Sequence, residues 1–379
     1  MLRQLKKNRL SVPVNEPLLD GREKQYLLKC IQTGWISSEG PFVKEFEDKF
    51  SRLIRRQHGI AVCNGSAALE IAVSALGIGK GDEVILPTFT IISCAAAIVR
   101  AGAMPVLVDS DPLTWNMDVS QIEPKITPRT KAIMVVHIYG LPVDMDPVLG
   151  LAKKYGLKII EDAAQMHGQT YKGIPCGGFG DISTFSFYPN KPITTGEGGM
   201  VVTNDPRLAE KCRSLRNLCF QPEKRFVHEE LGWNFRLSNL QAALGVAQLE
   251  QLNKFVKRKK AMGLYYTKRL SDLRTLQLPV VKKSYAENIY WVFGILLKDE
   301  VAFDAAACMK KLADFGIGTR PFFYGMHEQP VFRKMGLFKN EKHPVSERLS
   351  RRGFYIPSGL ALTKPQMKYV ADVLRKLVP

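Results

Sequence analysis

The sequence predicts an α/β protein in which helices cover both faces of a mostly parallel sheet, with a smaller α+β part following it. From about residue 58, short apolar runs alternate with helix-like segments, which is typical of parallel strands joined by crossover helices. The runs are apolar throughout, as expected of strands that are buried on both faces. With 379 residues, 45% of them hydrophobic and 24% charged, the chain is long enough to bury a sizeable core.

The expected strands follow one another closely in the first 205 residues. They cover residues 60–63, 83–86, 104–108, 132–137, 157–160, 182–187 and 200–203. Between the first two strands, apolar residues recur at helical spacing from Ala68 to Leu76 and stop before Gly77 and Gly79. This pattern predicts a crossover helix.

The pattern changes after Asp205, where longer helix-like segments begin. We expect a long helix over residues 238–273, a strand over 290–297, and helices over 303–315 and 364–377. We therefore divide the chain into a large domain of residues 12–255 and a small C-terminal domain of residues 256–379. Whether the N-terminal segment packs on the small domain is left open.

Charge and cysteine content narrow the classes of protein that fit. Fifty-four Lys and Arg against 36 Asp and Glu give a net charge of +18, which attracts anions such as nucleic acid, an anionic membrane surface or a nucleotide diphosphate. Zinc-finger spacing and RNP-type aromatic motifs are lacking, so we expect no nucleic-acid partner. The seven cysteines show no metal-ligand spacing, and we expect reduced thiols and no metal.

Membrane insertion and secretion are not expected. The longest apolar stretch, residues 91–99, is far shorter than the roughly 20 residues that span a bilayer. Residues 1–7 are basic but lack the apolar middle of a secretory signal. These features predict a cytoplasmic protein.

Three groups of residues at the carboxyl ends of expected strands could carry chemistry, because open α/β sheets bind ligands at that edge. The first is the segment 64–69, in which a strand leads directly into a helix. Asn64 can cap this helix, and Gly65 allows a tight turn. The N–H groups of Ser66 and Ala67 would then point at an anion. Helix capping alone would also explain the segment.

The second group is Glu161 and Asp162, two acids at the end of a buried strand, where a carboxylate needs a cation or hydrogen bonds to stay ionised. A metal site is a rival interpretation, but His167 alone supplies too few further ligands. The third is Lys191, which follows an aromatic strand and lies between two prolines that restrict the loop. A desolvated lysine has a lowered pKa and can act as nucleophile and base.

Together, an anion cradle, a carboxylate and an amine are what pyridoxal 5'-phosphate requires. Lys191 would bind its aldehyde, and Asp162 would keep the pyridine nitrogen protonated. The cradle of Gly65, Ser66 and Ala67 would hold the phosphate.

The chain resembles the DegT/DnrJ/EryC1/StrS family of sugar-nucleotide aminotransferases, which are fold type I pyridoxal-phosphate enzymes. The resemblance rests on five stretches in the family's order: residues 35–40, 64–69, 161–165, 185–199 and 232–243. It implies that Lys191 is the Schiff-base lysine and Asp162 the pyridinium partner. It also implies that Gln165 binds the ring's phenolic oxygen, that Ser186 joins the phosphate cradle, and that Asn234 reaches the phosphate from the second subunit of a homodimer.

One position departs from the family pattern, because Ile91 stands where many relatives have an aromatic residue that stacks on the cofactor ring. Looser cofactor retention is therefore expected. Lys191 itself favours amino transfer, since some members carry histidine there and are dehydratases.

Within the family, residues 187–199, 244–250 and 320–327 resemble those of enzymes that use L-glutamate to aminate C4 of GDP-4-keto-6-deoxy-mannose. This resemblance implies that the product is GDP-perosamine. Amination of a UDP- or dTDP-linked 4-keto sugar and pyridoxal-phosphate-dependent dehydration or racemisation of a sugar stay open as alternatives. Arg225, Arg320 and His327 are the candidates for binding the nucleotide diphosphate, although each could equally be an ion-pair partner.

Overall fold

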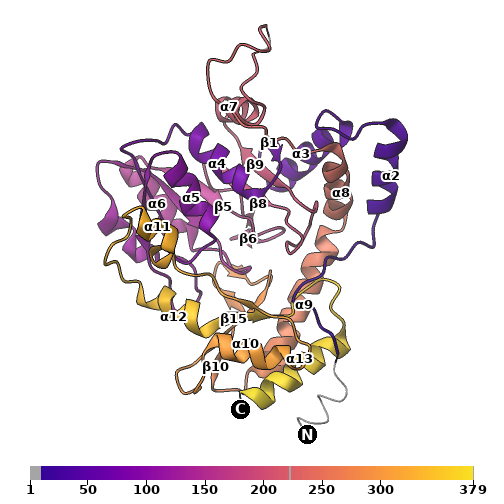
Figure 1. Ribbon diagram of the computed structural model, residues 1–379, viewed down its shortest axis with the longest axis vertical. Helices are drawn as coiled ribbons and strands as arrows, with labels where there is room; N and C mark the ends of the chain where they lie inside the picture. The colour runs from indigo at the N-terminus through magenta and orange to yellow at the C-terminus, as the bar shows by residue number, and fades with distance from the viewer. Residues whose placement is uncertain (1–9, 222, 379) are drawn as a thin grey trace.

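A computed structural model describes residues 10–221 and 223–378, and its elements are arranged around two main sheets (Figure 1). The basic segment of residues 1–9 lies outside the described residues. No helix in the described part of the chain is long and apolar enough to cross a bilayer.

The first sheet has seven strands in the order β1-β9-β8-β5-β4-β2-β3. The pairs from β8 through β5, β4 and β2 to β3 are parallel, and β9 pairs antiparallel with both β8 and β1. All seven expected strands are present, with small differences at their ends: β1 (His58–Val62), β2 (Glu83–Pro87), β3 (Met104–Val108), β4 (Thr130–Val136), β5 (Lys158–Asp162), β8 (Ile182–Ser186) and β9 (Gly199–Thr203).

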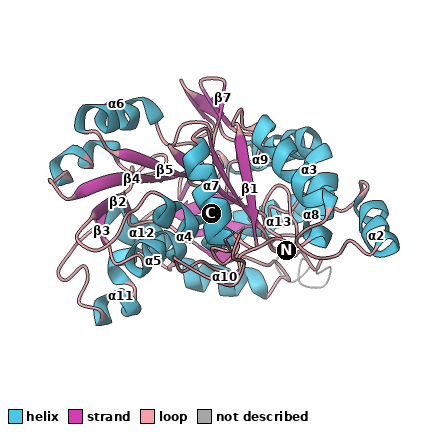
Figure 2. Cartoon of the chain, turned by 90° about the horizontal axis from the view of Figure 1, so that it is seen from above, coloured by secondary structure: helices cyan, strands magenta, loops and turns pink. Residues whose placement is uncertain are grey.

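Helices cover both faces of this sheet, as the uninterrupted apolar runs predicted (Figure 2). Side chains alternate along each strand, so Ile60 and Val62 face one layer while Ala61 faces the other. The first layer contains α4 (Gly65–Ala75), α5 (Ile92–Arg100) and α7 (Pro206–Arg216), and the second contains α3 (Pro41–Leu53), α6 (Met145–Tyr155) and α8 (Asn239–Glu250). Outside the second layer, α2 (Glu23–Thr33) packs on α8.

The second sheet is antiparallel, with the strand order β10-β13-β15-β14. Its strands are β10 (Leu276–Gln277), β13 (Phe293–Leu297), β14 (Arg320–Pro321) and β15 (Gly353–Ile356). Apolar side chains of β10, β13 and β15 form one core with α9 (Leu252–Leu270), α10 (Ala305–Ala313) and α13 (Lys364–Leu377). The N-terminal segment joins this core, because Val12 is buried in it and exchanges backbone hydrogen bonds with Gly316 and Gly318.

The remaining elements are short and lie in the connections. They are η1 (Val119–Gln121), η2 (Glu123–Lys125), β6 (Thr170–Tyr171), β7 (Ile174–Pro175), β11 (Lys282–Lys283), β12 (Ala286–Glu287), η3 (Met326–Glu328), α11 (Pro330–Lys334) and α12 (Pro344–Arg352).

The prediction of a single long helix over residues 238–273 is wrong, because this segment is divided at Gln251 into α8 and α9. The two helices pack on different cores. α8 and the first turn of α9, including Phe255, belong to the core of the seven-stranded sheet, whereas Met262 and Tyr266 of α9 belong to the second core. The division of the chain near residue 255 stays a prediction, and this change of partner along α9 supports it.

Candidate active site

A cavity of about 800 Å³ lies where the carboxyl ends of the parallel strands face the second sheet. Its walls come from both parts of the chain. The seven-stranded sheet and its loops contribute residues 64–66, 90–93, 162, 164–165, 184–186, 188 and 190–191. The second sheet and its loops contribute Trp291, Arg320–Tyr324 and Tyr355. The size is within the usual range for small-molecule sites.

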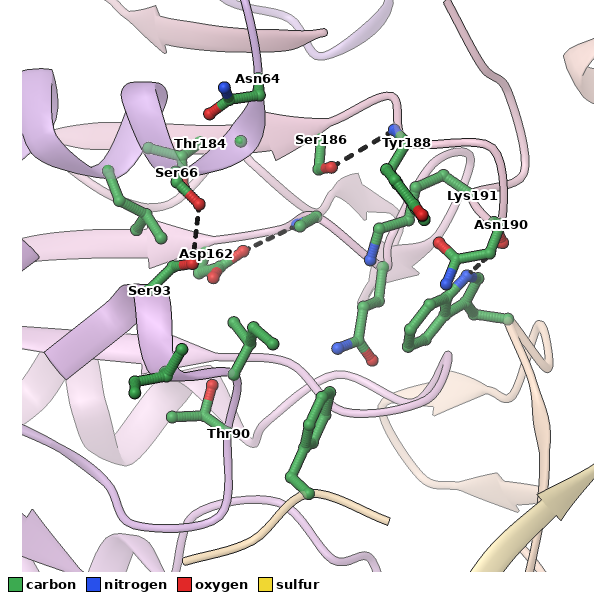
Figure 3. A pocket seen from close by; sticks show the side chains of 18 of the residues that line it. Asn64, Ser66, Thr90, Ser93, Asp162, Thr184, Ser186, Tyr188, Asn190 and Lys191 are labelled. Atoms are coloured by element: carbon green, nitrogen blue, oxygen red, sulfur yellow. Dashed lines mark hydrogen bonds between the residues drawn. The ribbon is translucent and has the colours of Figure 1, made fainter. Parts of the chain in front are cut away.

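Lys191 reaches this cavity from the loop that follows β8 (Figure 3). Its backbone N–H donates to the carbonyl of Tyr188 at 2.8 Å, which closes a tight turn over residues 188–191 that contains Pro189. The Nζ atom lies 3.8 Å from the centroid of the Trp291 ring. Burial lowers the pKa of the Lys191 ammonium to about 8, although the Asp162 carboxylate opposes this shift. The amine is therefore more readily deprotonated than an exposed lysine.

The two acids at the end of β5 have separate surroundings, because consecutive residues of a strand point to opposite faces. Asp162 lines the cavity, where its Oδ1 accepts from the Ala164 N–H at 3.0 Å and its Oδ2 lies 3.2 Å from Cys94 Sγ. Burial raises the pKa of the Asp162 carboxyl. Glu161 instead accepts from backbone N–H groups of the 177–180 turn and from His137, so it holds that turn in place.

The predicted anion cradle lies at the start of α4, but one of its predicted donors is not available. Gly65, Ser66 and Ser186 line the cavity, and a Cβ added to Gly65 would lie 2.7 Å from Ser186 Cβ. Only glycine therefore allows this approach. The prediction that the Ala67 N–H is free for an anion is wrong, because it donates to Asn64 Oδ1 at 2.8 Å. Helix capping by Asn64 uses that group.

Two further residues that the sequence predicts to contact the cofactor also line the cavity. Gln165 is 4% exposed and its Oε1 accepts from the Tyr139 N–H at 2.6 Å, which orients the amide. Ile91 is the N-cap residue of α5, is 43% exposed, and presents an aliphatic side chain to the cavity.

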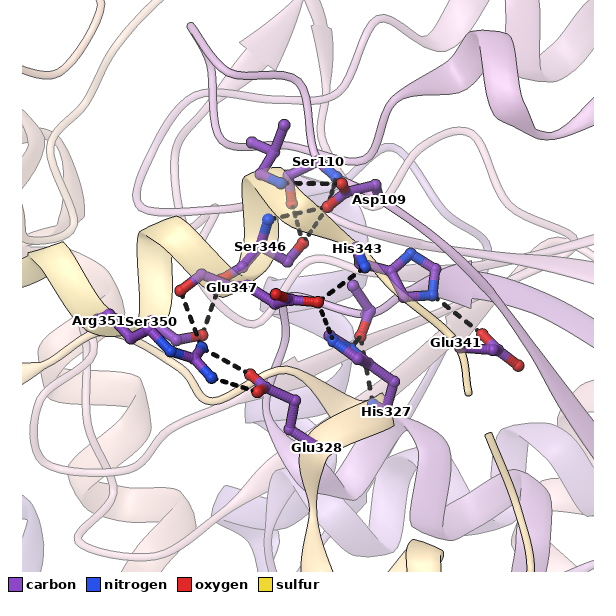
Figure 4. A network of polar contacts seen from close by, with 12 residues as sticks. Asp109, Ser110, His327, Glu328, Glu341, His343, Ser346, Glu347, Ser350 and Arg351 are labelled. Atoms are coloured by element: carbon purple, nitrogen blue, oxygen red, sulfur yellow. Dashed lines mark hydrogen bonds and ion pairs between the residues drawn. The ribbon is translucent and has the colours of Figure 1, made fainter. Parts of the chain in front are cut away.

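The candidates for the nucleotide diphosphate lie in different places. Arg320 lines the cavity. Arg225 does not; it lies beside the rings of Phe220 and Phe226. His327 is 1% exposed and outside the cavity, with Nδ1 2.8 Å from Thr88 Oγ1 and Nε2 3.3 Å from Glu347 (Figure 4).

Asn234 also lies outside this chain's own cavity, in a bridge with Asn217. This position leaves open the expected contact with the site of a second subunit.

The profile of the DegT/DnrJ/EryC1/StrS aminotransferase family matches residues 17–375. The chain belongs to this family. A GDP-perosamine synthase from Escherichia coli O157:H7 is 43% identical over 96% of this chain and 98% of its own length. A GDP-perosamine synthase from Caulobacter vibrioides is 40% identical over 97% of this chain and 98% of its own length.

Other members of the DegT family support the fold and the kind of cofactor. The putative pyridoxal phosphate-dependent aminotransferase EpsN of Bacillus subtilis is 33% identical over 96% of this chain and 95% of its own length. The crystal structure of DesV from S. venezuelae has a TM-score of 0.87 and 34% identity, and the match covers 94% of each chain. The predicted α/β fold is thus confirmed as that of the DegT-family aminotransferases.

The site suits the cofactor expected of a DegT-family member. Thr184 Oγ1, in the cavity wall, is buried and has no hydrogen-bond partner among the described residues. The Gly65 cradle has space that a side chain would fill, and hydroxyl groups of Ser66 and Ser186 stand beside it. These hydroxyl groups suit a phosphate, the carboxylate of Asp162 suits a protonated ring nitrogen, and the amine of Lys191 suits an aldehyde. The cavity therefore offers a partner for each of these three groups of the cofactor.

Sequence reasoning missed two residues beside the proposed catalytic pair. Trp291 presents its ring to Lys191, and its Nε1–H donates to the Asn190 carbonyl at 2.7 Å. Cys94 contacts Asp162 from the first turn of α5. Both contacts join residues far apart in the sequence. The only sequence signal that could have drawn attention to either residue is that Trp291 lies in the expected strand over 290–297.

Proposed function

We propose that this protein is a pyridoxal-phosphate-dependent aminotransferase that moves the amino group of L-glutamate to C4 of GDP-4-keto-6-deoxy-mannose, which yields GDP-perosamine. The observation that carries the proposal is a cavity lined by both Lys191 and Asp162, in a chain that is 43% identical to a GDP-perosamine synthase along nearly its whole length. The seven free cysteines support a reducing compartment such as the cytoplasm.

In this proposal the bound cofactor supplies an aldehyde that condenses with amines and a ring that accepts electrons. Asp162 would hold the ring nitrogen through a charge-assisted hydrogen bond. Ser66 and Ser186 would bind the phosphate at the N-terminal end of α4, where the helix dipole favours an anion. Gln165 would bind the phenolic oxygen, and Ile91 would pack on one face of the ring.

Lys191 has two tasks in this scheme. Its Nζ would anchor the cofactor between reactions, and once released it would take the proton from the α-carbon of glutamate as a general base. A base works best when its pKa is close to the working pH, and burial brings the pKa of Lys191 to about 8. The Trp291 ring beside Nζ limits where the released amine can go.

The nucleotide diphosphate would enter on the side of the second sheet. Arg320 is exposed there, at the cavity wall, and can pair with phosphate oxygens. The net charge of +18 would also raise the local concentration of such a substrate.

The proposal includes a homodimer in which Asn234 of one subunit serves the cavity of the other. Large apolar side chains are exposed near that segment and near α2, as expected of a surface that is covered by a partner. Leu231 is 93% exposed and Phe226 81% exposed, and Trp35 and Ile36 follow α2 with about half of their surface exposed.

Mixed dimers test the shared site. Lys191→Ala and Asn234→Ala should each be inactive alone. If the sites are shared, coexpression should restore about a quarter of the wild-type activity, since half of the dimers are mixed and each mixed dimer holds one complete site of two. Failure to restore activity in dimers shown to be mixed would contradict the sharing of sites.

Parallel assays test the reaction and the substrate. The enzyme is incubated with glutamate and with 4-keto-6-deoxy sugars linked to GDP, UDP or dTDP, and 2-oxoglutarate and the amino sugar are measured. The GDP-linked sugar should react fastest, and Lys191→Ala should give no product. Preference for the UDP or dTDP sugar would overturn the substrate, and loss of a sugar hydroxyl without 2-oxoglutarate would overturn amino transfer.

A further inference from the structure

Cys94 contacts the carboxylate of Asp162 without itself lining the cavity. It lies in the first turn of α5, is 0% exposed, and its backbone N–H donates to the Ile91 carbonyl. Its Sγ is 3.2 Å from Asp162 Oδ2 and 3.3 Å from Thr90 Oγ1. The thiol is therefore placed between a hydroxyl and an acid.

The direction of these hydrogen bonds follows from the chemistry of the three groups. Burial raises the pKa of the Cys94 thiol well above its usual value, and the nearby Asp162 carboxylate raises it further, so the sulfur keeps its proton. An ionised carboxylate can only accept. The S–H therefore donates to Asp162 Oδ2, and the sulfur accepts from the Thr90 hydroxyl.

With this bond, both oxygens of Asp162 are held, because Oδ1 accepts from the Ala164 N–H at 3.0 Å. The two donors come from different elements, one from α5 and one from the loop after β5. Two separate donors fix the plane of the carboxylate while leaving a further lone pair on each oxygen.

We propose that Cys94 is a positioning residue that orients the Asp162 carboxylate and moderates its basicity through a thiol hydrogen bond. The bond itself is independent of the reaction, whereas its importance for catalysis rests on the proposed function. A thiol is a weaker donor than a hydroxyl. It therefore stabilises the carboxylate less than serine would and more than alanine, which cannot donate.

A buried cysteine can also serve only to fill space, and Cys212 provides the matched control. It is likewise 0% exposed and in the same core layer, on α7, with Arg213 and Arg216 as the charges that affect its thiol. Replacing Cys212 removes the same volume without touching Asp162.

Infrared spectroscopy of the S–H stretch tests the hydrogen bond directly, in protein with or without cofactor. Difference spectra of wild type minus Cys94→Ala and wild type minus Cys212→Ala isolate the two bands. The Cys94 band should lie at lower frequency, as in a donating thiol, and should move towards the Cys212 band in Asp162→Ala. Equal frequencies for the two thiols in wild-type protein would overturn the proposal, whatever the enzyme's reaction.

Kinetics test the positioning role. Cys94→Ala should lower kcat about tenfold, which corresponds to the loss of one hydrogen bond to a charged group, with little change in KM for glutamate. Cys94→Ser should restore most of kcat, because it keeps a donor of similar size. Cys212→Ala and Cys212→Ser should leave kcat unchanged. Equal kcat values for Cys94→Ala and Cys94→Ser would overturn the positioning role.

Discussion

Lys259 is a second buried lysine, and its pKa makes the stability of the protein depend on pH in a way that can be measured. It lies on α9, is 3% exposed, and its Nζ donates to the carbonyls of Trp291, at 2.9 Å, and Ser358. Burial lowers its pKa from 10.5 to about 7. Since both partners are backbone carbonyls, the charge of the ammonium is poorly compensated.

The sign and size of the effect follow from proton linkage. The unfolded chain binds this proton more tightly than the native protein between pH 7 and pH 10.5, so the contribution of Lys259 to the free energy of unfolding rises with pH in that window. A group that titrates alone changes this free energy by at most about 1.4 kcal/mol per pH unit. Because Lys259 is half-protonated near pH 7, its contribution should rise by about 2 kcal/mol between pH 7 and pH 9.

The assay compares urea unfolding of wild type, Lys259→Met and Lys260→Met at several pH values. Lys260 is the neighbouring lysine on the same helix, and it pairs with Glu287 at the surface. The unfolding free energy of wild type minus that of Lys259→Met should rise by about 2 kcal/mol from pH 7 to pH 9. The unfolding free energy of wild type minus that of Lys260→Met should stay constant over the same pH range. If the free energies of unfolding of wild type and Lys259→Met changed in parallel with pH, the reasoning would be refuted.

Two further predictions concern the cavity. Gly65→Ala should raise the dissociation constant for pyridoxal phosphate about tenfold or more in an absorbance titration, because the new Cβ would meet Ser186 Cβ at 2.7 Å. Gly150→Ala should leave this constant unchanged, because apart from the backbone of its own helix no described atom lies within 4 Å of the new Cβ. The rate at which cofactor-free protein binds pyridoxal phosphate covalently should increase with pH, with a midpoint near the pKa of Lys191 of about 8, because only the neutral amine attacks. In Asp162→Asn this midpoint should move to lower pH, since the carboxylate raises the pKa of the lysine; a midpoint that stays in place would count against their electrostatic coupling.

The parts of the structure that could be predicted were those with a local signal. The buried strands are apolar throughout, and the residues at their carboxyl ends reach one edge of the sheet whatever the rest of the chain does. For this reason the sequence could predict that Asp162 and Lys191 lie at the same edge of the sheet, and both line the cavity. The Ala67 error had a local cause, because capping by Asn64 and anion binding compete for the same N–H groups.

The parts that could not be predicted depend on contacts between distant segments. Arg225 and His327 were chosen for their chemical type, but the fold of the second half decides which basic residue faces the cavity, and it selects Arg320. Likewise, nothing in the local sequence places Cys94 beside Asp162 or the Trp291 ring over Lys191. Side-chain type therefore predicted which residues could carry the chemistry, whereas the contacts of those residues depend on the tertiary structure.

The two buried lysines show why burial alone does not make a catalytic amine. Burial lowers the pKa of both, to about 8 for Lys191 and about 7 for Lys259. Lys259 donates to two carbonyls in the interior and is not among the residues that line the cavity. Lys191 lines a cavity that Asp162 also lines, and Trp291 links the two lysines because its carbonyl binds Lys259 and its ring contacts Lys191. Access to the cavity and a nearby carboxylate, rather than the lowered pKa, therefore distinguish Lys191 from Lys259.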